Sequence, residues 1–317
     1  MRFGSRDEAR VGDPTVSGQP VLVPLGEPRT GWEAIVELAL AEDIGGGDVT
    51  SLAMIAAGTH ARATIVAKAG GVVSGLDVAG AVFRRVNPAV AFAARVPDGQ
   101  RVRPGDPVAE VAGLARSLLT AERVALNLLQ RLSGVATLTA AYVAAVAGTG
   151  TQIVDTRKTT PGLRALERAA VRDGGGRNHR FGLGDGVLIK DNHLAAVGGA
   201  DRVGRAVRLA RERAPHTSRI EVEVTTPAEA AEAVAAGADV ILLDNMDPAA
   251  MREAVGLIGG RALVEASGGV NLATVRAIAE TGVNLISVGA LTHSAPALDL
   301  SLEFSVGSET PEARPKP

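Results

Sequence analysis

The sequence Ile220-Glu-Val-Glu-Val224, followed by an Ala-rich segment and then by Val240-Ile-Leu-Leu-Asp244, decides the fold class of this chain. Similar short apolar runs, separated by Ala-rich stretches of helical composition, recur at Gln152–Asp155, Gly186–Lys190, Ala262–Ala266 and Asn284–Val288. Buried strands that alternate with helices predict a parallel sheet. No Gly-rich dinucleotide turn follows the first strand, which favours a closed barrel over an open doubly wound sheet.

A smaller α/β domain precedes the barrel. Between Trp32 and about Gly113, short β-type runs alternate with turns such as Pro97-Asp-Gly-Gln100. Apolar residues at helical spacing then predict a linking helix from about Ala115 to Leu132. We therefore expect the small domain over residues 31–132, rejoined by 291–305, and the barrel over 133–290. Residues 1–30 read as a mobile extension and 306–317 as a disordered tail.

Composition excludes several classes of protein. The 317 residues carry a formal net charge of −2, so a general attraction to nucleic acid or to acidic membranes is not expected. The absence of Cys excludes disulfides, thiolate metal sites and a cysteine nucleophile, and it fits the cytoplasm. The longest apolar stretch, about Val124 to Ala147, is interrupted by Asn127, Gln130 and Arg131, so it reads as a soluble helix and not as a membrane span.

Basic residues gather in three segments: Asp155–Gly162, Gly174–Arg180 and Leu188–His193. If these segments surround one barrel mouth, they bring together Arg157, Lys158, His179, Arg180 and Lys190. Like charges that crowd a partly dry site repel one another, so this cluster predicts a ligand with several negative charges. Arg forks suit carboxylates and the compact Lys ammonium suits phosphates. The alternative is that each cation belongs to a surface salt bridge.

Lys190 and three acids sharpen this prediction. Lys190 follows Val-Leu-Ile in what reads as an interior strand, where an unpaired Lys is rarely tolerated, so we favour a functional role for it. Glu221 and Glu223 share one strand face, and Asp244 ends the next strand. Such carboxylates can bind ribose hydroxyls or a Mg²⁺ ion that grips phosphate. The alternative, favoured for Glu221, is a network that compensates the nearby lysines.

Two late loops favour phosphate binding. Ser267-Gly-Gly269 precedes a helix and Val288-Gly-Ala290 closes the last strand, so backbone N–H groups could approach a phosphate there. A role in turn formation alone is the alternative. The signatures of a P-loop, a zincin and a hydrolase elbow are absent from the sequence. His60, His193, His216 and His293 show no metal-ligand spacing, so a tightly bound transition metal is not expected.

Taken in order, these segments closely resemble the quinolinate phosphoribosyltransferase family. The resemblance covers about residues 30 to 305 and rests on Ala41–Ser51, Glu122–Asn127, Thr156–Arg164, Gly174–Arg180, Leu188–His193, Glu221–Glu223, Leu243–Asn245, Glu265–Gly269 and Val288–Ala290. It implies an N-terminal α/β sandwich followed by an open α/β barrel of the type II phosphoribosyltransferase kind. It also implies a homodimer, with a hexamer as an alternative assembly, in which Arg123 reaches the neighbouring site.

The resemblance further implies a pentosyl transfer in NAD biosynthesis. Quinolinate and phosphoribosyl pyrophosphate would give nicotinate mononucleotide, pyrophosphate and CO₂, with Mg²⁺ required. The implied quinolinate ligands are Arg157, His179, Arg180, Lys190 and the partner's Arg123, with Thr156 also in the substrate site. Lys158 would lie between quinolinate and pyrophosphate, and Glu223 and Asp244 would serve the ribose and the metal. The implied catalytic residues are Lys158, Lys190, Glu223 and Asp244, and the 5′-phosphate loops are Ser267, Gly268, Gly269, Val288, Gly289 and Ala290.

Three other functions fit parts of the pattern. A molybdate-associated paralogue would share the barrel but use a different acceptor, although Arg157, His179 and Arg180 favour a dicarboxylate. A Schiff-base aldolase could use a buried Lys190 at a strand end. A non-catalytic sensor would bind phosphoribosyl pyrophosphate without releasing pyrophosphate.

Overall fold

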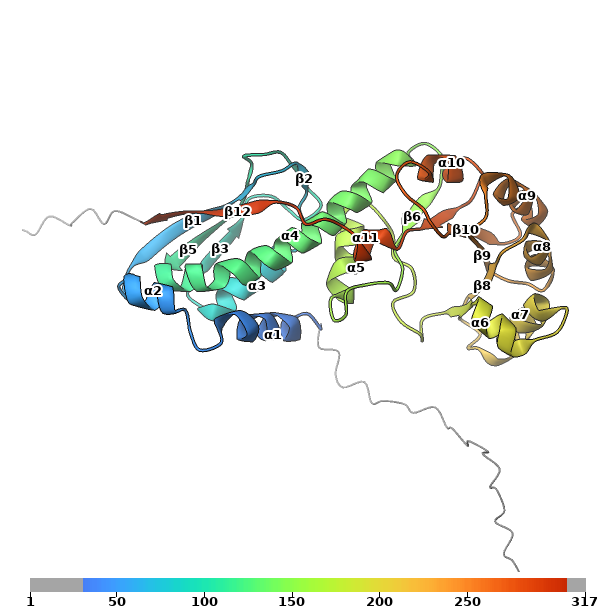
Figure 1. Ribbon diagram of the computed structural model, residues 1–317, viewed down its shortest axis with the longest axis horizontal. Helices are drawn as coiled ribbons and strands as arrows, with labels where there is room; N and C mark the ends of the chain where they lie inside the picture. The colour runs from blue at the N-terminus through green and yellow to red at the C-terminus, as the bar shows by residue number, and fades with distance from the viewer. Residues whose placement is uncertain (1–30, 307–317) are drawn as a thin grey trace, which may run out of the picture. The chain divides into compact units, whose positions relative to one another are not determined.

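A computed structural model describes residues 31–306 of the chain (Figure 1). The predicted N-terminal extension, residues 1–30, lies outside the described residues. The same holds for the predicted tail except for its first residue, Val306, which ends strand β12. Across the described part of the chain, no helix is both long and apolar enough to cross a membrane.

The N-terminal part is built on a four-stranded antiparallel sheet in the order β12-β1-β5-β3. Its strands are β12 (Leu300–Val306), β1 (His60–Ala67), β5 (Pro107–Leu114) and β3 (Ala91–Ala94), and a separate pair is formed by β2 (Gly71–Val72) and β4 (Arg101–Val102). The helices are α1 (Glu33–Ile44), α2 (Val49–Met54) and α3 (Leu76–Val86). Alternate residues Ala61, Ala63 and Ile65 of β1 are buried, as expected for a sheet with one covered face. Because β12 pairs with β1, the end of the described chain returns to this sheet after the barrel.

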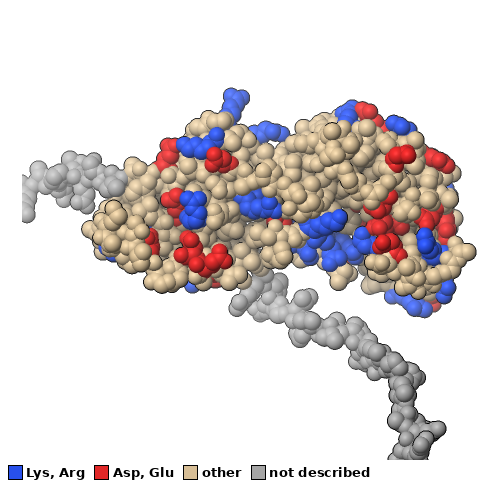
Figure 2. Space-filling view, in the orientation of Figure 1, with Lys and Arg blue, Asp and Glu red and all other residues tan. Residues whose placement is uncertain are grey.

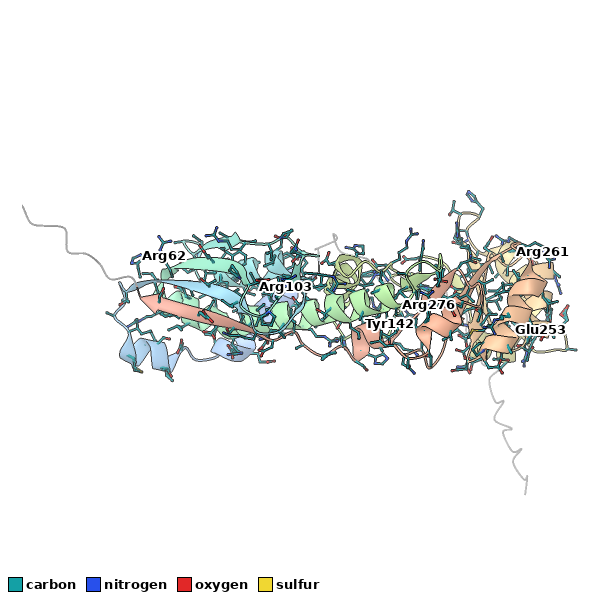
Figure 3. All side chains as sticks on the ribbon, turned by 90° about the horizontal axis from the view of Figure 1, so that it is seen from above. Arg62, Arg103, Tyr142, Glu253, Arg261 and Arg276 are labelled. Carbon is teal, nitrogen blue, oxygen red and sulfur yellow. The ribbon has the colours of Figure 1, made fainter. Side chains whose placement is uncertain are left out.

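Helix α4 (Ala115–Ala145) joins this sheet to the barrel and is much longer than the predicted helix. Val135, Ala136 and Ala140 continue the buried stripe beyond Leu132, so the helix does not end at the expected boundary. At its far end Tyr142 donates a hydrogen bond to the carbonyl oxygen of Val270 (3.5 Å), which ties α4 to the barrel (Figure 3). The residue boundary between the predicted domains therefore falls inside one continuous helix.

The barrel is a parallel sheet of six strands in the order β6-β11-β10-β9-β8-β7. The strands are β6 (Gln152–Val154), β7 (Val187–Ile189), β8 (Ile220–Val224), β9 (Val240–Asp244), β10 (Leu263–Ser267) and β11 (Leu285–Ser287), at the six predicted places. The helices are α5 (Arg164–Asp173), α6 (Asp191–Val197), α7 (Arg202–Arg213), α8 (Pro227–Ala235), α9 (Pro248–Ile258), α10 (Val275–Ala279) and α11 (Ala290–His293). Thr226 and Asp247 cap α8 and α9, each before a proline, which fixes where these helices begin.

The barrel is open, as the family resemblance implied, and the closed barrel inferred from the absence of a Gly-rich dinucleotide turn was wrong. The sheet ends at β6 and β7, and in the described residues these two strands do not pair. Arg177 makes an isolated parallel bridge to Val154 at the free edge of β6. The segment around Arg177 thus covers part of the edge at which a closed barrel would have a further strand.

Alternation along the strands separates core from cavity. Val222, Val224, Ile241 and Leu243 are fully buried and belong to the hydrophobic core, whereas the residues between them line hollows of the barrel. The repeated Glu in Ile220-Glu-Val-Glu-Val224 therefore places two carboxylates inside the barrel and leaves the branched apolar residues for the core.

We expect Gly134→Ala to destabilise the protein by about 1–3 kcal/mol, because a Cβ at this position in α4 would collide with the carbonyl oxygen of Pro296. Gly256 in α9 has open space around it, so Gly256→Ala should be neutral or should stabilise by up to about 1 kcal/mol. Urea unfolding of both variants checks this pair. Equal effects of the two substitutions would show that the close approach of α4 to Pro296 is not a constraint.

Candidate active site

A cavity of about 620 Å³ lies at the carboxyl ends of the barrel strands. Its lining includes eleven of the fifteen predicted substrate-binding residues: Thr156, Arg157, Lys158, His179, Arg180, Lys190, Glu223, Asp244, Ser267, Gly268 and Gly269. Figure 2 shows basic side chains gathered beside acidic ones on the barrel part of the visible face. The convergence of the three basic segments on one mouth is thus present in the structure.

The segment that carries His179 and Arg180 is fixed by a carboxylate with no solvent exposure, Asp155. Asp155 accepts hydrogen bonds from the backbone N–H of His179 (2.7 Å) and from Asn178 Nδ2 (2.6 Å). Burial raises the pKa of Asp155, and these hydrogen bonds together with the charge of Arg168 oppose that shift. Arg168, whose own pKa is lowered by burial, donates to the carbonyl oxygens of His179 (2.7 Å) and Arg180 (3.2 Å). Asp155 and Arg168 were not among the predicted site residues.

The segment that carries Lys158 is fixed by a second fully buried carboxylate, Glu167 of α5. Glu167 accepts from the backbone N–H (3.0 Å) and the hydroxyl (2.7 Å) of Thr160 and from Arg131 Nη2 (2.8 Å). At the start of this segment, the hydroxyl oxygen of Thr156 accepts from the backbone N–H of Lys158 (3.1 Å). Glu167 and Arg131 also escaped prediction, although a Glu in the apolar stripe of a helix is a signal that could have been used.

Lys190 lies in a different environment from the one predicted. Strand β7 is an edge strand that ends at Ile189, so Lys190 follows it as the first residue before α6, with a side chain 46% exposed. Its Nζ forms an ion pair with Glu223 Oε2 at 2.6 Å. The prediction of a Lys in an interior strand was therefore wrong, because the open sheet edge leaves the ammonium in contact with water. The Glu223 carboxylate is the compensating acid that the alternative interpretation named.

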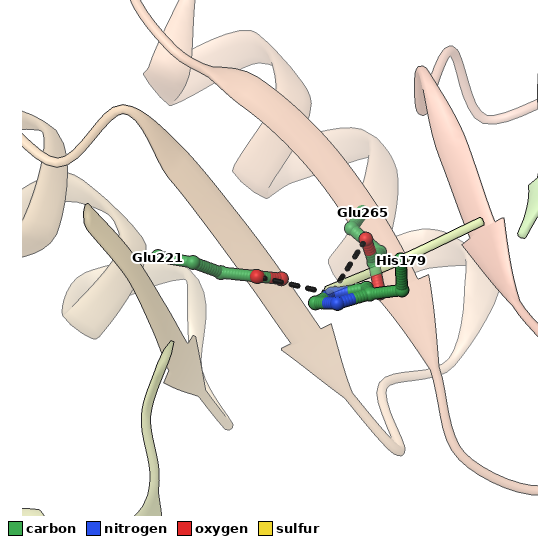
Figure 4. A group of neighbouring side chains, drawn as sticks. All are labelled: His179, Glu221 and Glu265. Atoms are coloured by element: carbon green, nitrogen blue, oxygen red, sulfur yellow. Dashed lines mark ion pairs between the residues drawn. The ribbon is translucent and has the colours of Figure 1, made fainter. Parts of the chain in front are cut away.

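His179, which lines the cavity, lies between two buried glutamates, Glu221 and Glu265 (Figure 4). Its Nε2 is 3.1 Å from Glu221 Oε2 and 3.7 Å from Glu265 Oε2, and its Nδ1 accepts from the backbone N–H of Arg180 (2.7 Å). Burial alone would lower the pKa of His179, but the hydrogen bond and charge of Glu221, aided by Glu265, raise it. Burial, together with the charge of Glu221, raises the pKa of Glu265 to about 7.

This trio is also the one group of three His, Asp or Glu residues in the described chain whose ligand atoms lie close enough for a metal ion, all within 4.8 Å. Glu221 therefore faces His179 and not a lysine, which corrects the interpretation that it compensates the nearby lysines. Glu265 was not singled out as a site residue in the sequence. The alternation in Ala262–Ala266 could have identified it, because Glu265 lies between Val264 and Ala266, which face the core.

Crowding also shapes the two glycine loops. Gly268 has a φ of 93°, and a Cβ there would lie 2.9 Å from the backbone nitrogen of Asn245, which itself has a φ of 53°. Gly289 lies beside the Lys158 stem, where a Cβ would be 3.2 Å from Lys158 Cδ. Val288, Gly289 and Ala290 are not part of the cavity lining: Val288 is buried and Ala290 begins α11. Gly289 contacts the stem of Lys158, which does line the cavity.

Arg123 does not line this chain's cavity. Its side chain is 58% exposed on α4 and lies 3.6 Å from Glu122.

Two family models match the chain: the N-terminal domain of quinolinate phosphoribosyl transferase over residues 48–133, and its C-terminal domain over 135–303. The chain is 45% identical over 271 residues to a probable nicotinate-nucleotide pyrophosphorylase (carboxylating) of Bacillus subtilis, covering 86% of this chain and 92% of the relative. It is 46% identical to the nicotinate-nucleotide pyrophosphorylase (carboxylating) of Mycobacterium leprae, with 85% and 95% covered. The crystal structure of NadC from Streptococcus pyogenes superimposes with a TM-score of 0.84 at 42% identity, with 88% and 98% covered.

The raised pKa of Glu265 has a consequence for stability. In the folded protein the Glu265 carboxyl keeps its proton up to about pH 7, whereas the ordinary pKa of a Glu is 4.5. The protonated Glu265 therefore stabilises the folded state at low pH, and this contribution is lost as the pH rises from 4.5 to about 7. We expect Glu265→Gln, which cannot ionise, to be more stable than the wild type by roughly 1–3 kcal/mol at pH 8 and similar to it at pH 5.

Urea unfolding of both proteins across this pH range measures the difference. Glu303→Gln is the control, because the Glu303 side chain is 58% exposed in an ion pair with Lys68 and should show little pH dependence above pH 5. If Glu265→Gln is more stable than the wild type by the same amount at pH 5 and at pH 8, the assignment of a raised pKa is contradicted.

Proposed function

The chain belongs to the quinolinate phosphoribosyltransferase family, and we propose that its barrel cavity transfers phosphoribosyl from phosphoribosyl pyrophosphate to quinolinate in NAD biosynthesis. The products are nicotinate mononucleotide, pyrophosphate and CO₂. The observation that carries this proposal is the cavity itself, in which Arg157, Lys158, Arg180 and Lys190 face two carboxylates, Glu223 and Asp244.

The cations suit a dicarboxylate and a pyrophosphate together. Quinolinate carries two carboxylates on one ring, and the guanidinium forks of Arg157 and Arg180 can each bind a carboxylate through two parallel hydrogen bonds. The Arg180 side chain is held from behind, because its Nη1 donates to the carbonyl oxygen of Gly186 (3.2 Å). Burial and the nearby charge of Arg157 lower the pKa of Arg180, a cost that a bound carboxylate would offset.

Transfer begins as pyrophosphate leaves the ribose. Positive charge develops on the sugar, where the fixed carboxylates Glu223 and Asp244 stabilise it, while Lys158 stabilises the negative charge that accumulates on the leaving group. The pyridine nitrogen then bonds to C1 of the ribose. Quaternisation makes the ring an electron sink, so the bond to the adjacent carboxylate can break, CO₂ departs, and the electron pair left on the ring carbon takes up a proton.

Glu223 and Asp244 are also the residues that would hold Mg²⁺. Their oxygen donors and their position at a wide cavity suit a cation that prefers oxygen and keeps several waters, and the same oxygens already bind Lys190 (2.6 Å) and Asn245 Nδ2 (2.9 Å). When bound, Mg²⁺ would neutralise pyrophosphate oxygens.

The proposed assembly is a homodimer in which Arg123 completes the partner's quinolinate site, with a hexamer as the alternative. An exposed Arg123 on α4, outside its own cavity, supports this proposal. We also place the protein in the cytoplasm, which is supported by a chain without Cys. The Schiff-base alternative needs a desolvated Lys190, whereas this Lys is half exposed and ion-paired.

The direct test mixes the protein with quinolinate, phosphoribosyl pyrophosphate and Mg²⁺ and follows nicotinate mononucleotide and pyrophosphate together, with nicotinate as the control acceptor. We expect product from quinolinate alone. Arg180→Ala should raise the KM for quinolinate by about 10–150-fold, the effect of losing one charged hydrogen bond. Arg213→Ala, on the exposed end of α7, is the matched control and should change nothing. Normal quinolinate turnover by Arg180→Ala would remove the acceptor site from this cavity.

Hybrid dimers test the shared site. Arg123→Ala and Lys158→Ala should each be nearly inactive alone. Coexpressed, they should recover roughly a quarter of wild-type activity, because about half of randomly paired dimers are hybrids and each hybrid has one site with both residues intact. Activity that stays at the level of the separate variants would show that Arg123 serves its own chain or no site.

A further inference from the structure

Helix α5 contacts both basic segments of the cavity through one face. Arg164, Glu167 and Arg168 are spaced i, i+3 and i+4, so their side chains leave the helix on the same side. Glu167 and Arg168 are both buried, although neither lines the 620 Å³ cavity that holds the basic residues. Two adjacent buried charges of opposite sign, each with its own set of partners, need an explanation beyond helix packing, because buried charges are costly unless they are paired and hydrogen-bonded.

The first set of partners leads to Lys158. Arg131, paired with Glu167, also donates to the carbonyl oxygens of Ala295 (2.9 Å) and Thr292. The hydroxyl of Thr292 in turn donates to the carbonyl oxygen of Lys158 (2.8 Å). The Glu167 carboxylate therefore holds Lys158 from two directions, through Thr160 on its own segment and through Arg131 and Thr292 from the other side.

The second set of partners leads to His179 and Arg180. Asp155 forms an ion pair with Arg168 (3.3 Å) and accepts a hydrogen bond from the backbone N–H of His179. Arg168 donates to the carbonyl oxygens of His179 and Arg180. Asn178 adds a contact between this carboxylate and the carbonyl oxygen of Arg168 (3.0 Å). The hydrogen bonds found in the described residues keep Glu167 and Asp155 in separate networks.

We propose that these are positioning residues with divided tasks: Glu167 and Arg131 place Lys158 for the phosphate-bearing substrate, and Asp155 and Arg168 place His179 and Arg180 for the dicarboxylate. The proposal rests on the function proposed above and assigns residues outside the cavity to each substrate. A displacement of about 1 Å of a group in the reacting geometry can lower the rate on the order of 100-fold. Loss of one network should therefore change the kinetics of the substrate whose binding residues it positions.

Arg164 joins the two halves. It donates to Thr159 Oγ1 (3.1 Å) on the Lys158 segment and to the carbonyl oxygen of Phe181 (3.1 Å), just beyond Arg180. It also donates to the carbonyl oxygen of Arg157 (3.4 Å). The backbone of Arg157 lies in the same segment as Lys158, but its side chain is proposed to bind quinolinate. Arg164→Met should therefore change the kinetics of both substrates, in contrast to changes in either network alone.

The experiment measures kcat and the KM of each substrate on full-length protein. Thr292→Val removes the hydroxyl that holds Lys158 while it leaves the ion pairs intact, and we expect the KM for phosphoribosyl pyrophosphate to rise or kcat to fall by about 5–50-fold, with the KM for quinolinate within about 2-fold. Asp155→Asn should do the reverse and raise the KM for quinolinate by about 10-fold or more. Glu167→Gln should repeat the Thr292→Val pattern more strongly.

Thr281→Val is the matched control. Its hydroxyl is also buried and also donates to a carbonyl oxygen, that of Ile278 (2.7 Å), but it lies after α10, away from the cavity. We expect both KM values and kcat to stay at the wild-type level. Melting temperatures of all variants separate misfolding from misplacement. If Glu167→Gln or Asp155→Asn does not fold, Thr292→Val and Asn178→Ala, which keep both carboxylates, test the same two networks.

The outcomes separate the two proposals. A wild type that makes no nicotinate mononucleotide from quinolinate overturns the proposed function and the substrate assignments with it. If the wild type is active but folded Thr292→Val and Asp155→Asn each raise both KM values, or lower only the melting temperature, the division of tasks is overturned and the function stands. The proposal is supported if Thr292→Val affects only the kinetics of phosphoribosyl pyrophosphate and Asp155→Asn only those of quinolinate.

Discussion

Two carboxylates without solvent exposure, Asp155 and Glu167, are the constraint on which the rest of the site depends. Five basic residues share one mouth of the barrel, and without internal anions the segments that carry them would repel one another. The two acids lie outside the cavity lining, where they bind backbone N–H groups and the guanidinium groups of Arg168 and Arg131. They therefore fix the cations from the protein side and leave the cavity side for a ligand.

The strand pattern supplies a second layer of anions. Alternation in β8 and β10 turns Glu221, Glu223 and Glu265 toward the barrel interior, while the residues between them build the core. Glu223 pairs with Lys190, and the other two glutamates enclose His179. Two of the five basic residues of the cavity, Lys190 and His179, thus have carboxylate partners within the barrel. A substrate carboxylate or phosphate that binds Lys190 therefore competes with Glu223.

The sequence predicted the parallel sheet and most of the cavity lining well, because both depend on local pattern. A strand such as Val240–Asp244 is legible from its apolar run, and polar residues after such strands must meet at one edge. It failed where distant segments decide the environment. Lys190 looked buried because β7 was taken as an interior strand. The end placed at Leu132 for α4 is a different kind of error, because the apolar stripe continues in the local sequence. Glu167 received no role although its place in the apolar stripe of α5 was a local signal, because its partners Thr160 and Arg131 belong to other segments.

By itself the sequence determined the class of fold, the basic residues that converge, and the acids that alternate along the strands, since strand period and helix spacing are properties of neighbouring residues. The family resemblance implied an open barrel, and the tertiary structure decided that it opens between β6 and β7 and that α5 anchors both basic segments. It also decided which acid pairs with which cation. The physical reason is that burial and ion pairing depend on which distant segments meet, and a charge has a different role in water, in an ion pair and in a dry core.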